Sequence, residues 1–354
     1  MKNMVKVFKK RVGLATKRTT IKDVAKAANV SPMTISNVIN NRLEFVSSKT
    51  KLRVEQEIVR LNYRRQTSAR NLRVSHQHSV GMIVLDESPK FLTDFFTTEL
   101  VAGLANVLNN ADYTMTIQGI NSRNFADSMI MRSFEVGGLC IMLSGAEEER
   151  KKVLEQLLSL KQPLVVFQQE VNEKNEHLCM IRQDDFYGGR LVGEHFLDMG
   201  VRDILVLRPN QNWPAIENRI KGLKEVLYNS RGQPKLSITD TESESFADVQ
   251  IALSNYLNQG SLPGAIFGCN DQIAYASILL LRDKGYNVPQ DVRVMGFNGF
   301  EAHRHLIPNL TTVISSAYEM GQIAGESMLS YFSTGYFPNS DTILPVKICL
   351  GDTT

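Results

Sequence analysis

The sequence predicts two unlike parts: a small all-α head at the N-terminus and a larger α/β body built on parallel sheets. In the stretch Thr20–Asn41, apolar residues recur at helical spacing, whereas from His76 onward short apolar runs alternate with amphipathic helical patterns. The charge divides at the same place. Residues 1–75 hold 18 Lys and Arg against 4 Asp and Glu, a net of +14, so the rest of this +3 chain carries −11.

The stretch Thr20–Asn41 has the pattern of a helix-turn-helix. Ile21, Val24, Ala25 and Ala28 form the apolar stripe of one short helix. Ser31 can cap a second helix, with Pro32 at its first position. Its inner face would be Ile35, Val38 and Ile39, and its outer face Met33, Thr34, Ser36, Asn37 and Asn40. A helical hairpin inside a larger core is the alternative interpretation of this pattern.

The basic charge of the head favours a polyanionic partner. Phosphate contacts and counterion release dominate the affinity of proteins for DNA, so a DNA-binding part should carry the positive charge. Residues 1–19 are also basic but lack the continuous apolar core of a secretory signal. We expect them to be a basic arm that attracts phosphates, or to have no specific role.

Three segments together resemble the DNA-binding head of the lac repressor–galactose repressor (LacI/GalR) family: TIKDVAKAANVSPMTISNVINN, VSSKTKLRVEQEIVRLNY and ARNLR. The resemblance implies a third helix from about Ser48 to Leu61, with Leu52, Ile58 and Leu61 facing inward. It also implies a hinge over residues 67–76, in which Leu72 enters the minor groove between the operator half-sites and kinks the duplex. The DNA contacts that we expect are Thr20, Ser31, Pro32, Met33, Thr34, Ser36, Asn37, Asn40, Arg70, Leu72 and Arg73.

The head departs from the family pattern at two places. Arg64 and Arg65 follow Tyr63, where the family usually has a proline, which affects the expected rigidity of the hinge. Asn37 stands where an arginine is common. Because asparagine pairs best with adenine and arginine with guanine, this difference predicts a different operator sequence.

The body alternates buried strands with helices, a pattern that predicts parallel sheets with right-handed crossovers. Roughly 275 residues are enough for two sheets, and two lobes create a cleft for a ligand. The predicted strands are Val80–Leu85, Tyr113–Ile117, Leu139–Leu143, Leu164–Phe167, Ile204–Leu207, Ala265–Phe267, Val292–Phe297 and Leu310–Ile314. The predicted helices are Glu99–Leu108, Glu147–Leu160, Gly189–Met199, Ile216–Tyr228, Val249–Leu257 and Ile273–Asp283.

The family resemblance continues through the body to about Leu350, carried by Asp184–Gly200, Ala265–Asn298 and Pro308–Leu329. It implies two lobes like those of a periplasmic sugar-binding protein, joined by three crossing strands. The domains expected are therefore a basic arm (1–19), a helix-turn-helix domain (20–66), a hinge (67–76) and an effector-binding and dimerisation body (77–354). Lobe one would hold about 77–169 and 316–341, and lobe two about 170–315 and 342–354.

The candidate ligand residues lie at expected strand ends and in loops. The resemblance implies that Arg190 and Asp271 contact the ligand, although Arg190 could lie on the surface and Asn270 or Asp271 could only cap a helix. Trp213 could stack on a sugar ring or anchor its loop. The remaining candidates are Asp184, Phe96 from the aromatic loop Asp86–Phe96, and Asn298 and Ser315, which depart from the family's usual residues. A phosphorylated or carboxylated ligand would require Arg190 and Arg182.

The sequence therefore predicts a ligand-responsive transcription regulator, most simply a repressor that binds a palindromic operator as a homodimer and is released by a sugar or sugar derivative. A corepressor-dependent regulator is the alternative, and a ligand-binding or transport protein without a DNA-binding role is a second one. No catalytic motif, metal spacing or cofactor loop is recognisable, so we expect no enzyme activity, metal or cofactor. The four separated cysteines and the absence of a membrane-spanning run predict a reduced, cytoplasmic protein.

Overall fold

The computed structural model describes residues 19–39, 42, 44, 46–61, 63, 78–86, 91–125, 128, 131, 136–171, 175–260, 262–300 and 307–354. They belong to two compact units that divide after Ser75. Four predicted DNA contacts, Asn40, Arg70, Leu72 and Arg73, lie outside the described residues, as does the arm before Thr19.

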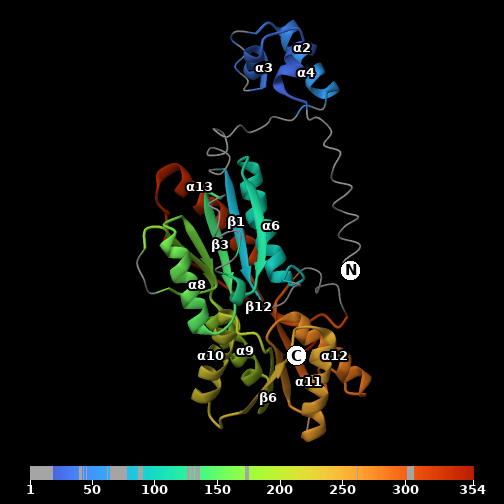
Figure 1. Cartoon of the computed structure of the whole chain (residues 1–354). Coiled ribbons are helices and arrows are strands. Elements are labelled where there is room, and N and C mark those ends of the chain that lie inside the picture. Colours follow the sequence, from blue (N-terminus) through green and yellow to red (C-terminus); the bar gives the residue numbers. More distant parts are fainter. Residues whose placement is uncertain are drawn as a thin grey trace, which may run out of the picture. The chain divides into compact units, whose positions relative to one another are not determined.

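The described part of the head contains three short helices, α2 (Ile21–Ala27), α3 (Pro32–Ile39) and α4 (Ser48–Arg60) (Figure 1). Each begins where the sequence supplies a cap. Thr20 and Asp23 form a reciprocal capping box at α2, and the Ser31 hydroxyl accepts a hydrogen bond from the Thr34 N–H at 3.1 Å. Between α2 and α3, Asn29 adopts φ +48°, a conformation that asparagine tolerates better than most residues. The predicted turn thus lies where Asn29 interrupts the apolar stripe.

The core of the head is the set of apolar faces that the periodicity predicted, with one exception. Val24, Ala25 and Ala28 of the first stripe are buried against Ile35 and Val38. In α4, however, Leu52 is 60 % exposed, and Val54 is fully buried in its place. Val54, Ile58 and Leu61 recur at i, i+4 and i+7, so the inward stripe of α4 does not include Leu52.

Lobe one of the body is a six-stranded parallel sheet in the order β11-β5-β4-β3-β1-β2. Helices α6 and α13 cover one face and α8 covers the other, so the sheet has an apolar cluster on each side (Figure 1). The strands are β1 (Ser79–Leu85), β2 (Thr114–Ile120), β3 (Gly138–Leu143), β4 (Leu164–Phe167), β5 (Leu178–Gln183) and β11 (Asp341–Leu344). The helices that the structure describes here are α6 (Phe95–Asn110), η2 (Ser122–Asn124), α8 (Glu147–Ser159) and α13 (Ala317–Thr334).

Lobe two has a second six-stranded sheet in the order β12-β10-β9-β8-β6-β7, parallel except for β12, which runs antiparallel to β10. One face packs on α9 and α10 and the other on α11 and α12. The strands are β6 (Asp203–Pro209), β7 (Lys235–Thr241), β8 (Ala265–Gly268), β9 (Arg293–Asn298), β10 (Thr311–Ile314) and β12 (Lys347–Cys349). The helices are α9 (Asp185–Asp198), α10 (Pro214–Asn229), α11 (Phe246–Gln259) and α12 (Asp271–Asp283).

The chain passes between the lobes three times: from β5 to α9, from β10 to α13, and from β11 to β12. The predicted lobe limits are wrong at two of these points. Residues 178–183 form β5 of lobe one, whereas the sequence predicts them in lobe two, and lobe one ends with β11 at Leu344 rather than at residue 341. The runs that became β5, β7, β11 and β12 are short or partly exposed, which is why the apolar pattern did not reveal them.

Two glycines allow α9 and α10 to approach each other closely, and this contact positions part of the cleft. A Cβ on Gly189 would overlap the backbone carbonyl of Arg219, and one on Gly222 would overlap that of Phe186. The backbone of α10 therefore lies directly against α9, with Arg219 at the contact. Among the described helices, none is long and apolar enough to cross a membrane.

Candidate functional site

The outer face of α3 is exposed and therefore available to a partner. Met33 is 69 % exposed, whereas Ile35 is fully buried and Val38 is 9 % exposed. Thr34, Ser36 and Asn37 are partly exposed, and Ser31 and Pro32 are exposed at the start of the helix. This face is small, polar and free of acidic side chains, which suits insertion into the major groove of DNA.

Helix caps around α3 limit what some of these residues contribute. Thr20 is occupied in its capping box, with its hydroxyl 2.7 Å from Asp23. The Ser31 and Thr34 hydroxyls lie 3.0 Å apart. Lys22 and Lys26 on α2 are exposed and add positive charge to the head. The structure thus presents Met33 and Asn37 as the larger side chains of the outer face, flanked by smaller hydroxyls.

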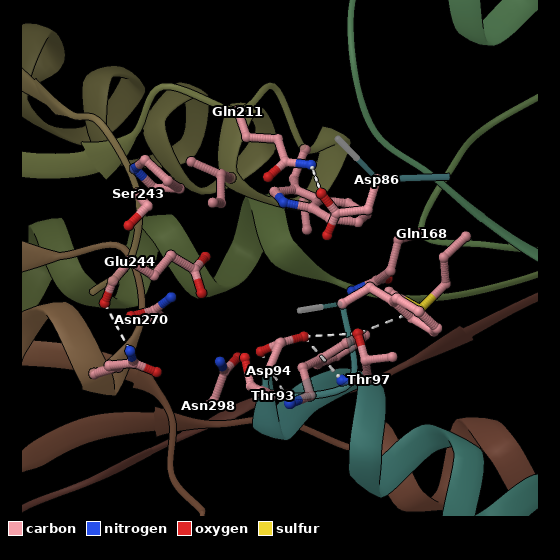
Figure 2. A pocket seen from close by; sticks show the side chains of 18 of the residues that line it. Asp86, Thr93, Asp94, Thr97, Gln168, Gln211, Ser243, Glu244, Asn270 and Asn298 are labelled. Atoms are coloured by element: carbon pink, nitrogen blue, oxygen red, sulfur yellow. Dashed lines mark hydrogen bonds between the residues drawn. The ribbon is translucent and has the colours of Figure 1, made fainter. Parts of the chain in front are cut away.

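The body contains a cavity of about 430 Å³ between the carboxyl ends of the two sheets (Figure 2). Both lobes line it, as is usual for ligand sites of open α/β sheets. Four aromatic side chains contribute apolar surface: Phe91, Phe96, Phe167 and Trp213. Trp213 is partly buried and packs against the apolar clusters of both lobes. Trp213 therefore anchors its loop and also lines the cavity, and its stacking on a sugar ring stays a prediction.

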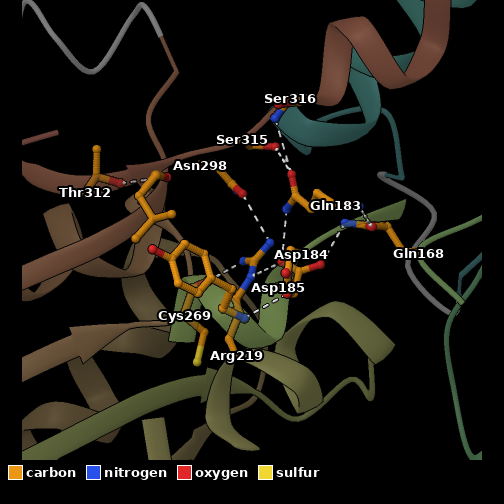
Figure 3. Close-up of polar contacts among 12 residues, drawn as sticks. Gln168, Gln183, Asp184, Asp185, Arg219, Cys269, Asn298, Thr312, Ser315 and Ser316 are labelled. Atoms are coloured by element: carbon orange, nitrogen blue, oxygen red, sulfur yellow. Dashed lines mark hydrogen bonds and ion pairs between the residues drawn. The ribbon is translucent and has the colours of Figure 1, made fainter. Parts of the chain in front are cut away.

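Arg219 is the cationic side chain among the described residues that line the cavity, and it is 3 % exposed (Figure 3). Its Nε donates to Asp185 at 2.8 Å, its Nη1 to the Cys269 carbonyl at 2.6 Å and its Nη2 to Asn298 at 3.4 Å. The guanidinium also lies 3.6 Å from the ring centre of Phe297. These contacts fix the orientation of the guanidinium.

Two glutamines of lobe one complete the surroundings of Asp185. The amides of Gln168 and Gln183 donate to the Asp185 carboxylate at 3.0 and 2.9 Å. Burial raises the pKa of Asp185 above its ordinary value, against the opposing effect of the Arg219 charge and the hydrogen bonds from Arg219 and Gln183. Because Gln168 lies in lobe one and Arg219 in lobe two, this network connects the lobes beneath the cavity.

Two residues of the cavity wall have strained backbones. Asn298 adopts φ +117° and Gln168 adopts φ +58°, both in regions that favour glycine. Asp271 holds the first of these turns, because its carboxylate accepts the Gly299 N–H at 2.7 Å and the Thr312 hydroxyl at 2.5 Å. Strain of this kind is concentrated at functional sites, which supports a ligand function for the cavity.

Acidic side chains enter the cavity from both lobes. Asp94 caps α6, accepting the N–H groups of Phe96 and Thr97 at 3.2 and 2.9 Å. Asp86 follows β1 and accepts the Gln211 amide at 2.5 Å. Glu244 follows β7 and is partly buried. Burial, with smaller contributions from the nearby charges of Asp94 and Asp86, raises the pKa of Glu244 to about 8, against the pull of Arg219 and a hydrogen bond from Asn270.

The structure brings half of the predicted ligand residues together. Phe96, Trp213, Asn270 and Asn298 line the cavity. The others do not, and they have other partners. Asp184 caps α9, Asp271 supports the Asn298 turn, and Ser315 donates to Gln183 at 2.8 Å where the chain crosses between lobes.

The predicted arginines also lie outside the cavity. Arg190 is about 41 % exposed and faces Glu194 at 3.3 Å and Glu225 at 3.8 Å. Arg182 is held by Asp341 at 2.7 Å. The prediction that Arg190 reaches into the cleft is therefore wrong for this structure, and Arg219 takes that place.

Sequence reasoning missed Arg219, Glu244, Asp86, Asp94, Gln168 and Gln211. A signal for Arg219 was present, because it interrupts the apolar stripe of Ile216, Ile220, Leu223 and Leu227 on the buried side of α10. Most of the others stand within a few residues after β1, β4, β6 or β7. The carboxyl ends of parallel strands were therefore the better guide to the cavity.

A helix-turn-helix head followed by a two-lobed body with a cavity between its lobes defines a class of protein: DNA-binding regulators that respond to a small ligand. Comparison with known families agrees. Residues 20–66 match the bacterial regulatory proteins of the lacI family, and residues 194–354 match the periplasmic binding protein-like domain. The HTH-type transcriptional repressor PurR of Pasteurella multocida is 32 % identical over 85 % of this chain and 88 % of its own length.

Further relatives extend the agreement. The ribose operon repressor of Haemophilus influenzae is 29 % identical over 88 % of this chain and 91 % of its own. The lac repressor dimer bound to operator and the anti-inducer ONPF superposes with a TM-score of 0.79 at 23 % identity, over 96 % of this chain and 99 % of that one. A LacI-family regulator of Enterococcus faecium with bound ribose has a TM-score of 0.65 at 22 % identity, over 78 % and 98 %.

This chain belongs to the lacI family of bacterial regulatory proteins. The predicted fold class, a helix-turn-helix head followed by a two-lobed α/β body, is confirmed. The chain is a ligand-responsive DNA-binding repressor, and its curated relatives are transcriptional repressors rather than enzymes.

Proposed function

We propose that this repressor works as a cytoplasmic homodimer on a palindromic operator. One recognition helix reads only a few base pairs, so two heads related by a two-fold axis supply the length of sequence that specificity requires. The structurally similar lac repressor is a dimer on its operator. The main support for DNA binding by the head is the exposed outer face of α3, where Met33 and Asn37 can contact base edges.

In each head, Pro32, Met33 and Asn37 would choose the operator sequence, while Thr20, Ser31, Thr34 and Ser36 would position the helix on the backbone. Met33 can make only apolar contact, for instance with a thymine methyl group. Asn37 can pair with adenine through two hydrogen bonds. Asn40 and the hinge residues Arg70, Leu72 and Arg73 belong to the same proposal on the ground of the family resemblance.

The effector would bind in the cavity between the lobes and be a sugar or sugar derivative. Aromatic walls, buried amides and carboxylates are the usual set of groups for a hydroxylated ligand. The ribose-bound structure of a similar body supports this class. Phosphorylated ligands are disfavoured, because Arg190 and Arg182 lie outside the cavity and Asp185 opposes the charge of Arg219.

We favour an inducer, whose binding releases the operator, over a corepressor. A ligand can do so only by binding two arrangements of the lobes unequally, and the network of Gln168, Asp185 and Arg219 connects the lobes. The test begins with selection of operator duplexes from a random palindromic pool by the full chain. Candidate sugars are then titrated against the complex. Release by a sugar supports the inducer, and tighter binding identifies a corepressor.

A further inference from the structure

The charge of the cavity wall narrows the chemical class of the effector more than the shape of the cavity does. Three of the four charged side chains that line the described part of the wall are acidic: Asp86, Asp94 and Glu244. The fourth, Arg219, has an acidic partner of its own, because Asp185 lies 2.8 Å from its Nε and is equally buried. A ligand in this cavity therefore meets an excess of negative charge.

Hydrogen bonds stabilise one of these acids without neutralising it. The Asp94 carboxylate accepts the N–H groups of Phe96 and Thr97 and the Thr97 hydroxyl at 2.7 Å, and all three donors are neutral. These bonds hold the Asp94 carboxylate in place at the N-terminus of α6. An anion brought into the cavity would be repelled by this fixed charge.

Glu244 faces Asp94 from the other lobe. Figure 2 shows the two side chains in the same cavity, Glu244 from the loop after β7 and Asp94 from the start of α6. Besides burial, the charges of Asp94 and Asp86 make ionisation of Glu244 unfavourable, and Arg219 only partly offsets them. The neighbouring acids are turned elsewhere: Glu242 of the same loop is exposed, and Asp248 in the first turn of α11 accepts the Ser243 and Ser245 hydroxyls.

We propose that the effector carries a protonated amine beside its hydroxyl groups, as an amino sugar does, and that the amine binds between Glu244 and Asp94. This inference rests on the proposed function of the cavity. A cation placed there offsets the repulsion that an ionised Glu244 would meet from Asp94, and so lets Glu244 ionise. The faces of Phe91, Phe96 and Trp213 also suit a cation.

The amine gives the ligand a direct effect on the arrangement of the lobes. Without it, Glu244 of lobe two and Asp94 of lobe one repel each other whenever both are ionised. With it, the two lobes share one cation. The ligand therefore binds the closed arrangement better than an open one, which is the differential affinity that switching requires. The amides of Gln168, Asn270 and Asn298 also line the wall, where the hydroxyl groups of a ligand can share them with their protein partners, which favours amino sugars over linear amines.

The test uses the full chain and matched sets of ligands in isothermal titration calorimetry. Glucosamine, galactosamine and mannosamine are each compared with the parent sugar, the N-acetyl derivative and the 6-phosphate, and putrescine and spermidine represent linear amines. We expect at least one amino sugar to bind 10-fold or more tightly than its three counterparts and than the linear amines. Its affinity should rise between pH 6 and pH 8, as less free energy is needed to ionise Glu244.

Glu244→Gln should remove both the preference for the amine and the rise with pH, whereas Glu242→Gln, in the same loop but exposed, should retain them. The proposal is overturned if a neutral or phosphorylated sugar or a linear amine binds most tightly, if no amino sugar binds, or if the preference survives Glu244→Gln. Tight binding of a neutral sugar that changes operator affinity would still support the proposed function. If no ligand of the set changes operator affinity, the proposed effector class is wrong as well.

Discussion

Replacing Arg219 with methionine should lower the free energy of unfolding by an amount that follows from the contacts of the arginine. The substitution keeps most of the side-chain volume but removes the partner of Asp185, which is 3 % exposed. Breaking a buried ion pair by removing one member costs about 3–5 kcal/mol, since the other charge is left uncompensated. Asp185 retains the amides of Gln168 and Gln183, so we expect the lower end, about 3 kcal/mol.

The assay is thermal unfolding of the full chain, monitored by circular dichroism. A loss of about 3 kcal/mol in a body of this size lowers the melting temperature by about 5–10 °C. The loss should depend on pH with a definite sign. Burial already raises the pKa of Asp185 in the folded state, and the loss of Arg219 raises it further. The stability of the variant therefore falls as the pH rises from the unfolded-state pKa of Asp185 to its folded-state pKa. The variant should therefore approach wild type at low pH.

Arg190→Met is the matched control. Arg190 lies on the neighbouring helix α9 and faces two glutamates, but it is about 41 % exposed. Exposed ion pairs contribute below about 1 kcal/mol, so this variant should unfold close to wild type. Adding Asp185→Asn to Arg219→Met should recover part of the loss, because it removes the buried charge. Equal destabilisation by Arg219→Met and Arg190→Met would refute the claim that Arg219, and not Arg190, forms a buried ion pair.

Three further predictions concern the head and the cavity. Asn37→Arg should change the preferred base at one half-site position by about 1–3 kcal/mol, and a binding-site selection that returns the wild-type profile would contradict our placement of α3. Ile35→Ala, in the core of the head, should cost about 2–5 kcal/mol and abolish operator binding, while Met33→Ala should leave the head folded in an urea titration. Because the pKa of Glu244 is about 8 in the folded chain against 4.5 for an ordinary glutamate, stability should fall as pH rises between these values. Glu244→Gln should remove this decrease of stability with pH. If the melting temperature of the variant changes with pH as that of wild type does, Glu244 is not its cause.

The head could be predicted closely because its structure is encoded in short-range patterns. The Ser31 cap, the interruption at Asn29 and the stripes of α2 and α3 involve residues a few positions apart. The error at Leu52 shows the limit of that method. Two stripes could be drawn through α4, and only packing against the other two helices selects the one through Val54.

The cavity could be predicted only in part, because its residues meet through the sheet topology rather than along the chain. Asn270 and Asn298 were found since each stands at the end of an evident strand. Adjacent residues nevertheless have opposite environments. Asp184 caps a helix at the surface while Asp185 is buried against Arg219. Which member of such a pair enters the cleft depends on the close contact of α9 and α10 at Gly189, a contact between segments that local periodicity does not relate.

The central claim is that a ligand in the cavity between the lobes controls operator binding by the head. The most direct measurement is the operator dissociation constant of the full chain, by fluorescence anisotropy, with and without the effector that the calorimetric set identifies. Asn270→Ser serves as the comparison, because serine retains the cap of α12 and removes the amide from the cavity wall. We predict a change of about 5- to 150-fold for wild type and none for the variant, with equal affinities in the absence of effector. An effector response that is the same in both proteins would contradict the claim.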